Sequence, residues 1–177
     1  MNVLPTRLPG PMLIEPRVFA DQRGFFLETY SRTPYSELGV DVEFVQDNHS
    51  RSVRNTIRGL HFQTGSGQAK LVRSARGRVW DVVVDIRRES PTFGEWEAFE
   101  LDDITHHQVF VPVGFAHGFC VTSEVADVCY RVSAPYDPAL ERGVAWDDPE
   151  IGIRWPTETP LLSERDRENP TIDSLAE

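Results

Sequence analysis

Lysine is almost missing from this chain. Of its 18 basic residues 17 are arginine, and Lys70 is the only lysine. Arginine presents a wide planar fork that stays charged, so a compact ammonium with a tunable pKa has to come from lysine. The single lysine is either a chance survivor of an arginine bias or a residue kept for chemistry. Its neighbours Arg58 and His61 favour chemistry.

Cysteine is scarce, and long apolar runs are absent. Cys120 and Cys129 do not make a disulfide framework, so we expect buried thiols in a reducing cytoplasm. The longest apolar runs are far shorter than a membrane span. The first twelve residues lack the charged start and apolar core of a signal peptide. The sequence therefore predicts a cytoplasmic protein without membrane association.

Positive charge is also in short supply. The net charge of −10 and the pI near 5.0 argue against a general nucleic-acid binder, which would show a basic face. The 26% of charged and 40% of hydrophobic residues are an ordinary globular mixture. We find no internal repeats and no linker, so we expect a single domain over residues 1–177.

Helical periodicity is almost absent as well. Short strand-like segments alternate with turns about every 8–12 residues, which favours an all-β sandwich or barrel and fits a jelly roll best. The clearest strand, 78–86, has the β-branched run of a segment covered on both faces. Segments 117–122 and 127–132 are predicted to form a hairpin, and 32–38 a short helix. Prolines make the segment from 135 to 177 irregular.

The stretch from residue 58 to residue 70 carries the strongest chemical signal. Side chains alternate along a strand, so Arg58 and Leu60 should face one way and His61 the other. A hairpin over the glycine turn at 65–67 would place Lys70 beside His61 inside the barrel. A nearby ammonium lowers the pKa of a histidine and keeps it neutral as a base. It also offers a positive charge to a developing oxyanion.

A second candidate is His117, in a Pro-x-Gly-x-x-His turn at 112–117 that resembles the second motif of the cupin superfamily. In metal-binding cupins this histidine joins a His-x-His pair, but here Gln63 stands where the partner of His61 would be. Lys70 lies in the same neighbourhood and would repel a cation, so we expect no metal. His117 is then either a satisfied core histidine or a substrate contact, and its flanking glycines favour the contact.

Several other polar residues have two interpretations each. Tyr130 is either packed in the core or the acid opposite a histidine base. Asp166 is either a solvated surface charge or the carboxylate that orients His61. Arg23 and Arg58 are either in surface ion pairs or bind a diphosphate through bidentate contacts.

Seven motifs occur in order between about residues 13 and 170, and together they resemble the dTDP-4-dehydrorhamnose 3,5-epimerase family. They are Asp21-x-Arg23-Gly24-x-Phe26, Phe44-Val45-Gln46-Asp47-Asn48-x-Ser50, Arg58-Gly59-Leu60-His61-Phe62-Gln63, Gln68-Ala69-Lys70, Ser90-Pro91-Thr92-Phe93-Gly94, Gly114-Phe115-Ala116-His117-Gly118-Phe119 and Leu162-Ser163-x-x-Asp166. The resemblance implies a cupin-type jelly roll, a double-stranded β-helix with short peripheral helices, that needs neither metal nor cofactor. It also implies a homodimer that exchanges N-terminal strands, with segment 135–177 packed on the barrel.

The resemblance further implies a reaction. Carbons 3 and 5 of dTDP-4-dehydro-6-deoxy-D-glucose would be inverted to give dTDP-4-dehydro-L-rhamnose, through removal of the protons alpha to the 4-ketone. His61 would be the base with Asp166 as its partner, Lys70 would stabilise the enolate, and Tyr130 would return a proton to the opposite face.

The same resemblance assigns the substrate-binding residues. His117 would lie in the sugar pocket, and the nucleotide and diphosphate would be bound by Gln46, Asn48, Arg58, Tyr136, Glu141 and Arg165, with Arg23 and Glu28 reaching across the dimer. Two departures stand out: the turn from His61 to Lys70 is one residue shorter than expected, and Arg165 replaces a frequent lysine. The open alternatives are a mono-epimerase, a metal-dependent cupin enzyme and a non-catalytic nucleotide-sugar binding module.

Overall fold

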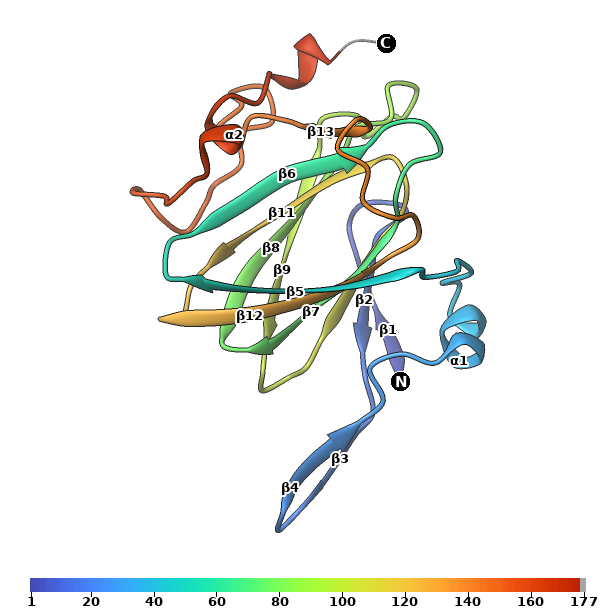
Figure 1. Ribbon diagram of the computed structural model, residues 1–177. Coiled ribbons are helices and arrows are strands. Elements are labelled where there is room, and N and C mark those ends of the chain that lie inside the picture. Colours follow the sequence, from blue (N-terminus) through green and yellow to red (C-terminus); the bar gives the residue numbers. More distant parts are fainter. Residues whose placement is uncertain (176–177) are drawn as a thin grey trace.

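The computed structural model describes residues 1–175, in which two antiparallel sheets face each other (Figure 1). One sheet has the order β1 (Asn2–Leu4), β2 (Met12–Glu15), β10 (Gln108–Val111), β7 (Lys70–Arg76), β12 (Val125–Val132) and β5 (Gln46–Val53). The other has the order β13 (Glu141–Gly143), β6 (Ile57–Gln63), β11 (Phe115–Val121), β8 (Arg78–Asp85) and β9 (Trp96–Asp102). The remaining elements are a hairpin of β3 (Val18–Asp21) and β4 (Gly24–Leu27), and the short helices α1 (Arg32–Glu37), α2 (Glu164–Arg167) and η1 (Ile172–Ser174). This is the jelly roll expected from the sequence.

The β-branched residues of strand β8 are buried on both faces of the sheet. Val79 and Val83 belong to the core between the two sheets. Val82 and Val84 point to the outer face, where they pack against Ile151 and neighbouring apolar residues of the C-terminal segment. The prediction that this strand is covered on both faces is confirmed, because the C-terminal segment takes the place of a third layer.

The C-terminal segment lies along the outer face of the five-stranded sheet (Figure 1). Its Trp155 packs edge-on against Trp80 of β8, with ring centroids 5.8 Å apart. A bridge between Thr56 and Leu161 fixes it beside the start of β6. This path brings α2 to the rim of the barrel next to β6.

The predictions of two hairpins, one over segments 117–122 and 127–132 and one over the glycine turn at 65–67, are wrong. Strand β11 pairs with β6 and β8, whereas β12 pairs with β5 and β7, so the turn at Ser123 carries the chain from one sheet to the other. Strands β6 and β7 also belong to different sheets. A turn signal between two strands marks a reversal of direction, and it does not say whether the two strands are hydrogen-bonded neighbours.

The N-terminal segment from Met12 to Asp21 contains two separate strands. Pro16 and Arg17 separate β2, which stays in the six-stranded sheet, from β3, which pairs only with β4. The β3–β4 hairpin projects from the barrel (Figure 1), and it exposes Phe25 and Phe26. Among the described residues, no helix is long and apolar enough to cross a membrane.

Candidate active site

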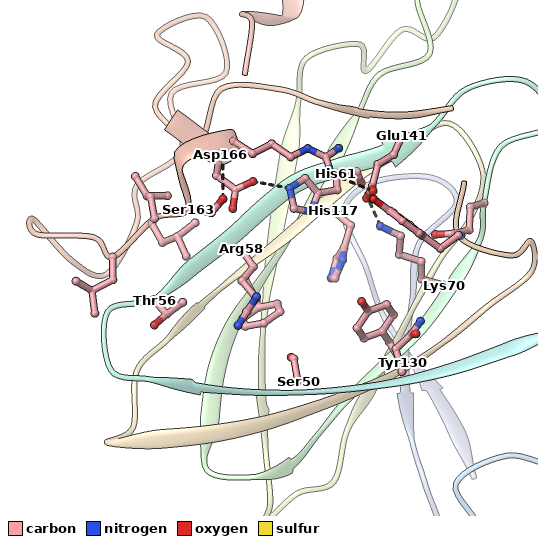
Figure 2. A pocket seen from close by; sticks show the side chains of 18 of the residues that line it. Ser50, Thr56, Arg58, His61, Lys70, His117, Tyr130, Glu141, Ser163 and Asp166 are labelled. Atoms are coloured by element: carbon pink, nitrogen blue, oxygen red, sulfur yellow. Dashed lines mark hydrogen bonds and ion pairs between the residues drawn. The ribbon is translucent and has the colours of Figure 1, made fainter. Parts of the chain in front are cut away.

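A cavity of about 700 Å³ lies between the two sheets. Strands β6 and β11 line one side, β5, β7 and β12 line the other, and β13 and α2 form the rim (Figure 2). The cavity brings together all but two of the residues singled out from the sequence, namely Gln46, Asn48, Arg58, His61, Lys70, His117, Tyr130, Tyr136, Glu141, Arg165 and Asp166.

His61 and Asp166 form a close pair at the rim. Nε2 of His61 on β6 lies 2.6 Å from Oδ1 of Asp166 on α2. Ser163 caps α2 by accepting a hydrogen bond from the backbone N–H of Asp166, so the helix holds the carboxylate in place. Burial raises the pKa of Asp166, but its hydrogen bonds to His61 and Ser163 outweigh burial and keep that pKa below its usual value. The carboxylate is therefore ionised and fixes the orientation of the imidazole.

Lys70 approaches the same histidine from the opposite sheet. Its Nζ donates a hydrogen bond of 3.1 Å to the backbone carbonyl of His61, and its side chain is buried. Burial lowers the pKa of Lys70 to about 8, although Glu141 and Asp81 act in the opposite direction. The predicted proximity of Lys70 and His61 is present, but it arises across the barrel and not through a hairpin.

A bulge in β6 turns Arg58 into the cavity. His117 of β11 stands opposite His61, and Phe119 stands opposite Arg58, so three steps along β6 match two along β11. Arg58 and His61 therefore both line the cavity, while Leu60 points to the outer cluster. The expectation that Arg58 and Leu60 share a face was wrong, because it assumed a strand without a bulge.

Gly59 and Gly118 make this bulge possible. Gly59 has φ of +131°, and a Cβ there would lie 2.5 Å from Cα of Gly118. Only glycine fits such a backbone contact at such a φ. The two glycines thus allow β6 and β11 to approach closely beside His61.

His117 has a partner that was not singled out from the sequence. Its Nε2 lies 3.0 and 2.9 Å from the two carboxylate oxygens of Asp81 on β8. His117 is therefore a buried histidine with a satisfied nitrogen, and at the same time it lines the cavity. The signal for Asp81 was present, because an aspartate in the middle of a β-branched run needs a buried partner.

Tyr130 projects into the cavity from β12, across from the two histidines (Figure 2). Burial raises the pKa of its hydroxyl above the usual value. The hydroxyl stays protonated at neutral pH, and it can donate a proton to a substrate carbon on the side opposite His61.

The rim is polar and holds several preformed contacts. Gln46 donates to Asn48 over 2.8 Å and accepts a hydrogen bond of 3.0 Å from the backbone N–H of Tyr136. Arg165 of α2 forms an ion pair with Glu141 of β13, with Nη1 and Oε2 3.1 Å apart. This pair connects the two segments that border the opening.

Arg58 adds a positive group inside the same cavity, since its Nε donates to Ser52 over 2.9 Å. The tips of its guanidinium remain free of that bond, which suits a bidentate contact to phosphate oxygens.

Arg23 and Glu28 do not line the cavity of their own chain. Arg23 lies at the tip of the β3–β4 hairpin, where it pairs with Asp21 and its side chain is 86% exposed. The expectation that Arg23 and Glu28 reach across a dimer concerns the cavity of a partner chain, and it stays a prediction.

The donor set around the cavity is not that of a metal site. Nε2 of His61 and Nε2 of His117 each face a carboxylate. Gln63 does not line the cavity. Among residues 1–175 no group of three or more His, Cys, Asp or Glu side chains is placed to hold a metal ion.

Fold and cavity define a cupin-type jelly roll with a histidine–carboxylate pair facing a buried ammonium. The sequence model described as dTDP-4-dehydrorhamnose 3,5-epimerase matches residues 5–174. The dTDP-4-dehydrorhamnose 3,5-epimerase of Salmonella typhimurium is 48% identical over 176 residues, which cover 98% of this chain and 96% of the relative. The dTDP-4-dehydrorhamnose 3-epimerase of Streptomyces niveus is 46% identical, with 95% of this chain and 82% of the relative covered.

A solved structure agrees. The dTDP-6-deoxy-D-glucose-3,5-epimerase of Legionella pneumophila, in complex with dTDP-4-keto-L-rhamnose, superposes with a TM-score of 0.96 at 41% identity, covering 99% of this chain and 94% of that one. The chain belongs to the dTDP-4-dehydrorhamnose 3,5-epimerase family. The predictions of family, fold class and epimerase activity are confirmed, and the metal-dependent alternative is not favoured.

Proposed function

We propose that this chain inverts carbons 3 and 5 of dTDP-4-dehydro-6-deoxy-D-glucose to give dTDP-4-dehydro-L-rhamnose. One observation carries the proposal: a histidine–carboxylate pair, a buried ammonium and a tyrosine hydroxyl face one cavity from both sheets. That arrangement suits removal of a proton alpha to a ketone and its return to the opposite face.

His61 is the base. Because Asp166 occupies Nε2, Nδ1 is the ring nitrogen left to accept the proton from carbon 3 or carbon 5. The electron pair of the broken C–H bond moves to the 4-keto oxygen and forms an enolate. Asp166 stabilises the imidazolium that results.

Lys70 and Tyr130 complete the cycle. The ammonium of Lys70 stabilises the enolate oxygen, and because its side chain is buried, bulk solvent screens its charge little. When the enolate collapses, Tyr130 gives its proton to the carbon from the opposite face, and the centre is inverted. The tyrosinate and the imidazolium then exchange protons with solvent, so the protein needs no redox group.

The rim residues bind the rest of the substrate in this proposal. Arg58 and Arg165 contact the diphosphate. Tyr136, which is 52% exposed at the opening, stacks on the thymine. Glu141, Gln46 and Asn48 bind the nucleotide through polar contacts.

We further propose that the active unit is a cytoplasmic homodimer whose β3–β4 hairpin places Arg23 and Glu28 at the cavity of the partner. The hairpin has no third strand beside it within the described residues, and it exposes Val18, Phe19 and Phe26. Apolar surface of this kind is typical of a segment that is covered in an assembly. The free thiols of Cys120 and Cys129 are compatible with a reducing compartment.

The test is solvent exchange. The protein is incubated with dTDP-4-dehydro-6-deoxy-D-glucose in heavy water, and carbons 3 and 5 are followed by NMR. We expect deuterium at both carbons and inverted couplings. His61→Ala should slow exchange by about 10³-fold while the nucleotide sugar still binds, because loss of a general base has an effect of this size. His49→Ala, on the exposed outer face of β5, is the matched control and should leave exchange unchanged.

The 3-epimerase relative makes a mono-epimerase the second candidate. Deuterium at carbon 3 alone would establish that activity instead. Tight binding without exchange at either carbon would indicate a nucleotide-sugar binding module. A requirement for stoichiometric metal would reinstate the metal-dependent alternative.

A further inference from the structure

A second histidine–carboxylate pair lies at the back of the cavity, and the steps above leave its carboxylate without a role. Asp81 is in the middle of β8 and is completely buried. Both of its oxygens lie within 3.0 Å of Nε2 of His117. His117 is buried too, and its ring lines the cavity from β11.

We propose that Asp81 is a positioning residue for the epimerisation, which orients His117 toward the sugar and supplies the buried negative charge that balances Lys70. The proposal rests on the proposed function and adds to it a residue that does not touch the substrate. Asp81 acts through His117 and Lys70, which both line the cavity.

The strand register explains the pair. Position 83 of β8 stands opposite His117 and position 81 stands opposite Phe119, so Asp81 is the diagonal neighbour of His117 on the inner face. Long side chains on such diagonals are within reach of each other. The bulge in β6 lies beside the same part of β11, where His117 pairs with His61 of β6.

The hydrogen bond fixes the tautomer of His117. A buried carboxylate is costly without a donor, and the side-chain donor that Asp81 has among the described residues is Nε2 of His117. An ionised carboxylate only accepts, so Nε2 carries the hydrogen. Nδ1 is then the nitrogen that faces the substrate. Without a hydrogen of its own, Nδ1 can accept a hydrogen bond from a sugar hydroxyl.

The charge of Asp81 also acts on Lys70. The titratable and charged groups that line the cavity around this ammonium are His61 and Arg58 on β6, His117 on β11, Tyr130 on β12, Tyr136, Glu141 on β13, and Arg165 and Asp166 on α2. Asp81 on β8 acts on the ammonium as well. Burial lowers the pKa of Lys70 to about 8, while Glu141 and Asp81 raise it. Removal of the charge at Asp81 must lower this pKa further, so the ammonium is lost at a lower pH.

The test compares Asp81→Asn with the wild type by the pH profile of kcat/KM, which reports the free enzyme. The amide keeps the size of the side chain and removes its charge. We expect kcat at pH 7 to fall about tenfold and KM to change little, because a positioning residue acts on the enolate more than on binding. The alkaline limb of kcat/KM should move to lower pH by about one unit.

The matched control is Asp102→Asn. Asp102 is also a buried carboxylate, but it accepts hydrogen bonds from Thr105 at the end of β9 and does not line the cavity. This variant should keep the wild-type limb even if it loses stability. An Asp81→Asn limb that coincides with that of the wild type and of Asp102→Asn would overturn the proposal.

A second measurement needs neither turnover nor a folded variant. Nitrogen NMR of the substrate-free wild type reports which ring nitrogen of His117 carries hydrogen. We expect hydrogen on Nε2 at every pH at which the protein is folded, and a ring with bare Nε2 would contradict the role of Asp81. If the wild type exchanges no deuterium, the proposed function fails, and this measurement still decides whether Asp81 holds His117.

Discussion

At the scale of single residues, Lys70 shows how position gives a common side chain an uncommon property. The ammonium is buried between two sheets, and its one hydrogen bond among the described residues goes to the backbone carbonyl of His61. Burial lowers its pKa to about 8 because the charged form loses hydration. The charge of this lysine therefore changes with pH in the range around pH 8.

We predict an alkaline limb in the profile of kcat/KM, which reports the pKa values of the free enzyme. Lys70 stabilises the enolate only when it is protonated, so kcat/KM should be full below about pH 8 and fall as pH rises through this value. Tyr130 does not produce this limb, because burial raises the pKa of its hydroxyl above the usual 10.0. The measurement is kcat/KM from pH 6 to pH 10.

The Lys70→Arg variant keeps the positive charge but removes the group that titrates near pH 8. A guanidinium stays protonated over this whole range, so the variant should lose the limb even though its activity is lower at every pH. A limb near pH 8 that persists in Lys70→Arg would show that another group titrates there.

At the scale of elements, the contact between β6 and β11 shapes the site. A Cβ at Gly118 would lie 2.7 Å from the backbone carbonyl of Arg58 and 3.1 Å from Cα of Gly59. Both of these atoms belong to the backbone of the neighbouring strand, which cannot rotate away. The close approach supports the bulge that turns Arg58 and His61 to the same side.

We therefore predict that Gly118→Ala destabilises the fold by about 1–3 kcal/mol, since an overpacked core costs this much. The expected fall in Tm is roughly 2–4 °C for each kcal/mol in a chain of this size. Calorimetry with kcat measured in parallel is the check, and we expect kcat to fall because Arg58 and His61 move.

Gly143→Ala is the comparison for this variant. Its Cβ would meet the side chain of Asn169 at 2.3 Å, and a side chain can turn aside. Neither Gly118 nor Gly143 has a positive φ, so conformational strain does not separate them. Equal losses of stability in the two variants would contradict the backbone explanation.

At the scale of the whole molecule, contacts within one chain do not explain why the β3–β4 hairpin exposes aromatic side chains. It extends from the barrel (Figure 1). Its aromatic side chains are exposed, and Arg23 lies in the turn between its two strands. If it reaches the cavity of a partner, each active site combines the barrel of one chain with the hairpin of the other. The dimer would then have a mass of twice the 20.1 kDa of the chain.

This arrangement predicts complementation between two inactive variants. In a mixed dimer of His61→Ala and Arg23→Ala, one cavity carries both defects and the other carries none. Random mixing makes about half of the dimers mixed, so about a quarter of all sites are intact. We expect about a quarter of the wild-type activity after the two proteins are denatured and refolded together, measured as deuterium exchange.

The control is refolding of each variant alone, which should give only the low activity of that variant. No gain on mixing would contradict the exchange of hairpins. It would leave the assignment of His61 unaffected, because that rests on contacts within one chain.

The class of fold, the family and eleven of the residues that line the cavity follow from the sequence alone. Short alternating segments leave few architectures that can bury them, and the residue types from Arg58 to Lys70 point to proton transfer. The tertiary structure alone sets which of these side chains lie beside each other in the cavity. Strands that follow each other in the chain lie in opposite sheets, so Lys70 reaches His61 across the core. The partner of Asp81 could not be predicted from the sequence. The register of β8 against β11 places Asp81 beside His117, and such pairing depends on contacts between residues far apart in sequence.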